Sequence, residues 1–137
     1  MIAYVDTSSL IKLYVEEAGT EAVRALVQEA SVVATSAAAS VEMRATLAAL
    51  RRDRRLTPSA YSATCESFAS DWAGLVTVEM DADVIRAAGN LAERHHLRAL
   101  DAIHLASFVQ VLERAGDEDV RFSSFDERLN RAARGLG

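Results

Sequence analysis

The chain lacks the features of secreted proteins, of membrane-spanning proteins and of small proteins held together by disulfides or zinc. Its 137 residues include one cysteine, Cys65, and one proline, so an internal disulfide is impossible and no cysteine spacing suits zinc. The longest apolar runs are too short to cross a membrane. The N-terminus also lacks the basic and long apolar regions of a signal peptide. These absences predict a cytoplasmic protein with no membrane partner.

The composition is that of an ordinary globular protein. Half of the residues are apolar and 26% are charged, which excludes a disordered chain and favours a single domain spanning residues 1–137. The net charge of -5, from 15 basic and 20 acidic residues, argues against a protein that grips nucleic acid over its whole surface. A local basic patch remains open, because the arginines cluster.

Strand-like and helical stretches alternate along the chain. Runs rich in Val, Ile and aromatic residues predict strands over residues 2–5, 31–35, 75–79 and 120–123. Helical patterns cover residues 20–30, 37–54, a segment from Pro58 capped by Thr57, a segment from 81 or 83 to 95, 100–114, and a last helix from 125. Ser124 and Glu127 have the spacing of a capping box for that last helix. Such alternation predicts a three-layer α/β/α domain around a parallel sheet of four to five strands.

Four acidic residues occupy corresponding places in this pattern. Asp6 ends the first strand, and Glu42 lies in the first turns of the helix after the second strand. Asp101 heads an apolar helix, and Asp126 follows the last strand. In an open parallel sheet the functional crevice lies beyond the carboxyl ends of the strands. We therefore expect all four carboxylates at one rim.

Each acid also has a local explanation. Asp6 and Asp101 would serve as helix caps, Glu42 as an exposed helical residue, and Asp126 as a charge that suits the dipole of the last helix. None of these roles requires the acids to gather. Two carboxylates about 5 Å apart repel by roughly 3 kcal/mol at an effective dielectric constant near 20. A divalent ion with oxygen ligands, Mg²⁺ or Mn²⁺, would offset that repulsion.

The segments around these acids resemble a known family. DTSSL from Asp6, then Glu42, then LDAIHLA from Leu100 and SFDERL from Ser124 are similar in order and spacing to the PIN domain. They are most similar to the VapC toxins of prokaryotic toxin–antitoxin pairs, and the resemblance spans nearly the whole chain. It implies a PIN-like fold and a metal-dependent endoribonuclease.

The resemblance also implies roles for the acids. Asp6, Glu42, Asp101 and Asp126 would hold one or two Mg²⁺ or Mn²⁺ ions, and the metal would activate a water for in-line attack on a phosphodiester. Asp6 and Asp101 would be direct ligands, while Glu42 and Asp126 would bind a second ion or position the water. Asp126 corresponds to the acid that varies most in the family.

Further residues and partners follow from the same resemblance. Thr7 and Ser124 match positions where the family often has a hydroxyl near the metal. The expected partners are an RNA substrate and a VapB-like antitoxin, in a homodimer or a toxin–antitoxin hetero-oligomer. His104, one turn beyond Asp101, is predicted to be a packed helix residue rather than a catalytic base.

The arginine cluster has two interpretations. A run of charge at a helix end is usually a solvated face, and cations there suit the helix dipole. The other interpretation is that the cluster binds RNA phosphates or an acidic partner segment, with a salt-dependent affinity. The residues concerned are Arg51, Arg52, Arg54 and Arg55.

Other functions fit the sequence less well. A catalytically inactive PIN-like module that binds protein or RNA is the main alternative, although such a module would usually have lost an acid. A phosphatase with an aspartyl nucleophile would need a second acid where Ser8 stands. A phospho-acceptor signalling domain would need an acid pair at the first strand and a lysine after the last strand.

Overall fold

The computed structural model describes residues 1–136, and its centre is a four-stranded sheet with the order β3-β2-β1-β4. All pairings are parallel, and β1 lies between β2 and β4, so that Ile2 is opposite both Val32 and Val120. The strands are β1 (Ile2–Val5), β2 (Val32–Ser36), β3 (Val76–Val78) and β4 (Val120–Ser123). The predicted parallel sheet is confirmed. The second strand begins and ends one residue later than expected, and the third is two residues shorter.

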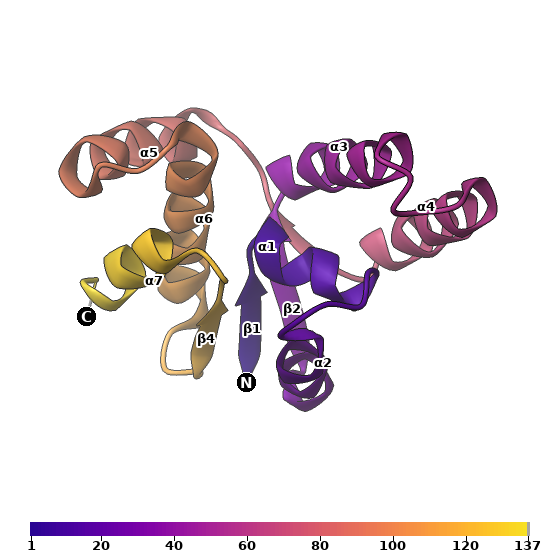
Figure 1. Ribbon diagram of the computed structural model, residues 1–137. Helices are drawn as coiled ribbons and strands as arrows, with labels where there is room; N and C mark the ends of the chain where they lie inside the picture. Colours follow the sequence, from indigo (N-terminus) through magenta and orange to yellow (C-terminus); the bar gives the residue numbers. More distant parts are fainter. Residues whose placement is uncertain (137) are drawn as a thin grey trace.

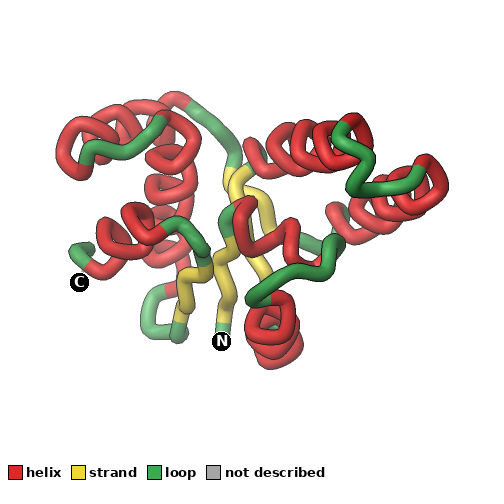
Figure 2. The backbone as a smooth tube through the Cα atoms, viewed as in Figure 1, coloured by secondary structure: helices red, strands yellow, loops and turns green. Residues whose placement is uncertain are grey.

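Helices cover both faces of this sheet. They are α1 (Thr7–Leu10), the 3₁₀ helix η1 (Ile11–Leu13), α2 (Thr20–Glu29), α3 (Ala38–Arg52), α4 (Pro58–Trp72), α5 (Ala82–His95), α6 (Ala99–Ala115) and α7 (Glu127–Arg134). Figure 1 shows α5, α6 and α7 on one side of the strands and α1 to α4 on the other, and Figure 2 shows the strands enclosed between the helices. This arrangement confirms the three-layer α/β/α fold. Within residues 1–136, no helix combines the length and apolar character that a membrane span requires.

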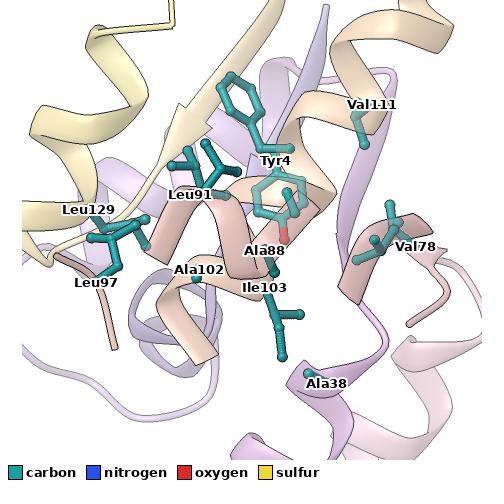
Figure 3. Close-up of a cluster of buried hydrophobic side chains, with 14 of the residues drawn as sticks. Tyr4, Ala38, Val78, Ala88, Leu91, Leu97, Ala102, Ile103, Val111 and Leu129 are labelled. Atoms are coloured by element: carbon teal, nitrogen blue, oxygen red, sulfur yellow. The ribbon is translucent and has the colours of Figure 1, made fainter. Parts of the chain in front are cut away.

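The core consists of one apolar cluster on each face of the sheet. Successive side chains of a strand point to opposite faces, so Tyr4 packs into the cluster under α5 and α6, whereas Val5 packs with Met43 and Leu47 of α3. Figure 3 shows Tyr4 close to Leu91 and other side chains of the first cluster. Full burial of an apolar side chain of this size contributes about 1.5–3 kcal/mol. The two clusters therefore hold the rim of the sheet between two rigid helical layers.

The helix starts test the predicted caps. Thr57 accepts a hydrogen bond from the backbone N–H of Ala60 and precedes Pro58, as the sequence predicts. The predicted Ser124 capping box is wrong: Asp126 caps α7, which begins at Glu127. The Ser124 hydroxyl is engaged elsewhere, because it donates a hydrogen bond to Asp6 at 2.6 Å.

Candidate functional site

Asp6 lies at the carboxyl end of β1, where its side chain is buried and caps α1. Oδ1 accepts hydrogen bonds from the backbone N–H of Ser9 at 3.0 Å and the hydroxyl of Ser8 at 2.7 Å, and Oδ2 accepts the hydroxyl of Ser124. The capping role is therefore real, but it uses one oxygen only. Burial raises the pKa of Asp6 despite these hydrogen bonds, which favour the ionised form.

Glu42 lies in the second turn of α3 and is not an ordinary exposed glutamate. Its side chain is 22% exposed, and its Oε1 lies 2.8 Å from both the Thr7 hydroxyl and Nε2 of His104. Burial by itself would raise the pKa of Glu42. The hydrogen bonds from His104 and Thr7 outweigh burial and lower that pKa. Glu42 is thus held as a carboxylate.

His104 is more than a packed residue of α6. It is buried as predicted, yet Nδ1 lies 2.8 Å from the hydroxyl of Tyr4 while Nε2 faces Glu42. A carboxylate only accepts hydrogen bonds, so we assign the proton to Nε2, and Nδ1 accepts the Tyr4 hydroxyl proton. Sequence reasoning missed this role. The spacing of His104 three residues after Asp101 was the available signal, since such residues neighbour each other on a helix.

Asp101 and Asp126 share a cation that sequence reasoning also missed. Nε of Arg98 lies 3.0 Å from Oδ2 of Asp101, and its Nη2 lies 3.3 Å from Oδ2 of Asp126. The cap interpretation of Asp101 is wrong, because Arg98 occupies the N-cap position of α6 and Asp101 lies in the first turn. Asp126 does cap α7, through Leu129. The Arg98 side chain is 78% exposed, so these ion pairs contribute little to stability.

Short links join the acids along the rim. Ser124 donates to Asp6 and accepts the backbone N–H of Asp126 at 3.0 Å. Arg98 then connects Asp126 to Asp101. Thr7, the residue after Asp6, donates to Glu42. The structure therefore brings together the four predicted acids and both predicted hydroxyls, as the parallel topology requires.

A metal ion at the rim would need several donor side chains to converge on one point. Within residues 1–136, no three side chains of His, Cys, Asp or Glu converge closely enough to hold an ion as they stand, because hydroxyls, His104 and Arg98 engage the carboxylates. Carboxylate oxygens are nevertheless the ligands that Mg²⁺ and Mn²⁺ prefer. Arg98 already places one positive charge between Asp101 and Asp126. A divalent ion at this place would have to displace the guanidinium, and metal binding stays a prediction.

The arginine cluster lies away from the acids. Arg51 belongs to the last turn of α3, nine residues from Glu42, which is about 14 Å along the helix axis. Its guanidinium lies over the ring of Tyr61, 5.4 Å from the centroid. In the described part of the chain no carboxylate pairs with the cluster, which consists of Arg51, Arg52, Arg54 and Arg55.

The comparisons with known proteins agree with a parallel α/β/α sheet that has acids at its carboxyl rim. The family model of the PIN domain matches residues 3–135, and the chain belongs to the PIN-domain family. Among curated proteins it is 35% identical to Ribonuclease VapC45 of Mycobacterium tuberculosis (strain CDC 1551 / Oshkosh) over 99% of this chain and 92% of the relative. Ribonuclease VapC49 of Mycobacterium tuberculosis (strain ATCC 25618 / H37Rv) matches with the same identity and coverage. Ribonuclease VapC46 of the latter strain is 33% identical over 98% of this chain and 92% of the relative.

Proposed function

We propose that this chain is an endoribonuclease of the VapC type, which hydrolyses RNA phosphodiester bonds with the help of Mg²⁺ or Mn²⁺. The observation that carries the proposal is the rim itself. At the carboxyl end of the sheet Ser124 links Asp6 to Asp126, and Arg98 links Asp126 to Asp101. Glu42 joins them through Thr7, the neighbour of Asp6 in the chain. The matches to three proteins named ribonucleases, over nearly the full chain, support the same activity.

In this mechanism Asp6 and Asp101 would be direct ligands of the ion, and Glu42 and Asp126 would hold a second ion or position the attacking water. When bound, the ion supplies positive charge that acidifies the water and stabilises the transition state of the phosphodiester. With an ion held by Asp101 and Asp126, the guanidinium of Arg98 would be free to bind a phosphate.

The surrounding residues keep the acids in place before the substrate arrives. Hydroxyls of Ser8 and Ser124 fix both oxygens of Asp6. The buried imidazole of His104 holds Glu42 at 2.8 Å and keeps it ionised. Such preorganisation holds Asp6 and Glu42 in position before the reaction begins.

The proposal also covers the role of the protein in the cell. The chain acts as the toxin of a toxin–antitoxin pair, with a VapB-like antitoxin as its partner and cellular RNA as its target. It works as a homodimer or within a toxin–antitoxin hetero-oligomer. The arginine cluster contacts either RNA or an acidic segment of the antitoxin, since among the described residues no carboxylate pairs with Arg51, Arg52, Arg54 or Arg55.

The test compares the parent with Asp101→Asn. Purified protein is incubated with mixed structured and single-stranded RNA in Mg²⁺, in Mn²⁺ and with EDTA. The exposed Asp117→Asn is the matched control, because it removes the same charge far from the rim. We expect cleavage by the parent and Asp117→Asn in either metal, none in EDTA, and none by Asp101→Asn. Cleavage by Asp101→Asn at the parental rate would refute the site.

The toxin role has its own measurement. Induction of the parent should stop growth, whereas induction of Asp6→Ala, produced to the same level, should not. Sequencing the RNA ends that appear after induction would identify the target. Equal growth under the two inductions would contradict the toxin role and favour a catalytically inactive binding module.

A further inference from the structure

The chain leaves some cations without a carboxylate partner despite its net charge of -5. Lys12, Arg24 and Arg121 each form an ion pair. Within residues 1–136, Arg128 and Arg131 of α7 form none. Unpaired positive charge on an acidic protein is available for an anionic ligand.

These arginines belong to a continuous basic surface between α5 and α7. One hollow of about 310 Å³ is lined by His95, His96, Arg128 and Arg131, together with Ala132. We call the four basic residues the α5–α7 strip. Nη1 of Arg128 donates to the backbone carbonyl of His96 at 3.2 Å, which ties the end of α5 to the start of α7.

The strip adjoins the acidic rim. A second hollow, of about 410 Å³, is lined by Arg98, Asp101, Asp126, Glu127 and Arg128. Arg128 lines both hollows, so the surface runs without interruption from the candidate metal ligands to Arg131. The two hollows beside the arginine cluster are lined by none of the four acids. The α5–α7 strip, in contrast, continues directly from the hollow that Asp101 and Asp126 line.

The local fold explains why the strip faces solvent. Leu129 and Ala132 anchor α7 in the core, which leaves Arg128 and Arg131 outside. Residues three apart on a helix have Cβ atoms about 5–6 Å apart on one face. Two guanidiniums at such a spacing suit successive phosphates of an extended strand, because each binds phosphate through its planar fork.

We propose that the α5–α7 strip binds the phosphate backbone of the RNA strand that leaves the acidic rim. The proposal rests on the proposed ribonuclease function and adds the path that the RNA strand takes across the surface beyond the acidic rim. The guanidiniums of Arg128 and Arg131, which line this hollow, hold the strand by charge at its phosphates. Contacts of this kind fix register and orientation and carry no sequence preference.

The experiment measures RNA affinity of the full chain in EDTA, where no metal-dependent cleavage takes place. The probe is a labelled single-stranded RNA of about twelve nucleotides with randomised sequence, followed by fluorescence anisotropy between about 50 and 200 mM salt. The test variant is Arg128→Ala/Arg131→Ala. The control is Arg86→Ala/Arg114→Ala, which removes the same charge from exposed positions outside the strip.

At about 50 mM salt we expect the test variant to bind RNA at least about tenfold more weakly than the parent. The slope of log affinity against log salt concentration should become shallower by about 1.4, because each of the two lost phosphate contacts contributes about 0.7. The control should stay within about twofold. Arg128→Lys/Arg131→Lys should recover much of the affinity, and this recovery excludes a mere folding defect. In the cleavage assay the test variant should raise KM and leave kcat near the parental value.

Several results would overturn the strip. One is that the parent binds no RNA in EDTA, and another is that the test and control variants bind RNA with equal affinity. A third is that polyglutamate competes as well as RNA at equal charge, which would identify a surface for acidic peptides. Failure of the strip is distinguishable from failure of the nuclease. Strip-dependent binding without any cleavage in Mg²⁺ or Mn²⁺ would refute the nuclease alone, and cleavage without strip-dependent binding would refute the strip alone.

Discussion

Truncation of His104 should destabilise the fold far more than its polar side chain suggests. The imidazole is 2% exposed and lies 2.8 Å from both the Tyr4 hydroxyl and Oε1 of Glu42. His104→Ala leaves the buried Tyr4 hydroxyl without that partner, at about 1–3 kcal/mol for a lost buried hydrogen bond, whereas Glu42 keeps the Thr7 hydroxyl. The cavity adds about 2 kcal/mol. The total, about 3–5 kcal/mol, is a large share of the roughly 5–15 kcal/mol typical of a folded domain.

His104→Gln separates hydrogen bonding from volume. Its amide offers an acceptor toward Tyr4 and a donor toward Glu42, so we expect a loss of only about 1–2 kcal/mol. Urea unfolding of the parent and both variants measures the differences, with similar m-values as evidence that the unfolded state is unchanged. A His104→Ala protein within about 0.5 kcal/mol of the parent, or equal losses for Ala and Gln, would refute the reasoning.

The same residue sets how stability depends on pH. The folded pKa of Glu42 is lowered, so its contribution is fully present above the unfolded-state pKa and is lost as pH falls through the folded pKa. Removal of His104 leaves burial to raise that pKa. A group with a raised folded pKa stabilises the folded state as it takes up a proton, so urea midpoints should fall less steeply across acidic pH in His104→Ala than in the parent. Coincident profiles would show that His104 does not control the ionisation of Glu42.

Four further substitutions test other parts of the structure. Burial raises the pKa of Asp6, so its ionised form destabilises the fold above the folded pKa and not in acid. Asp6→Asn should raise stability near pH 7 by about 0.5–2 kcal/mol, a gain that thermal unfolding should show disappearing as pH falls. Arg98→Met should tighten Mn²⁺ binding, measured by electron paramagnetic resonance titration, because Arg98 competes for two carboxylates; unchanged affinity would contradict that competition. Gly19→Ala should destabilise by about 1–2 kcal/mol, since Gly19 has φ +97° and an added Cβ would lie 2.6 Å from Phe125. By contrast Gly89→Ala, in open space within α5, should stabilise by about 0.5–1 kcal/mol, and denaturant midpoints compare the two.

Sequence patterns predicted the layers of the fold well because they depend on short-range chemistry. Apolar β-branched runs and 3.6-residue periodicity place strands and helices within one or two residues. Strand ends are less predictable, since pairing partners decide them: β3 contains only Val76–Val78 because these residues pair with β2. The start of α7 was mispredicted for a related reason. Ser124 looks like a cap locally, but the carboxylate of Asp6, 118 residues away in sequence, accepts its hydrogen bond.

By itself the sequence predicted which residues carry chemistry, namely the four acids and the two hydroxyls, and it determined a family whose parallel topology gathers strand ends. Tertiary structure alone decided which side chains hold those acids. His104 and Arg98 looked ordinary in the sequence, yet one positions Glu42 and the other bridges Asp101 and Asp126. Periodicity records whether a residue faces the core or the solvent. It does not record which polar groups from distant segments meet there, because burial leaves each one dependent on whatever partner the fold brings within hydrogen-bonding distance.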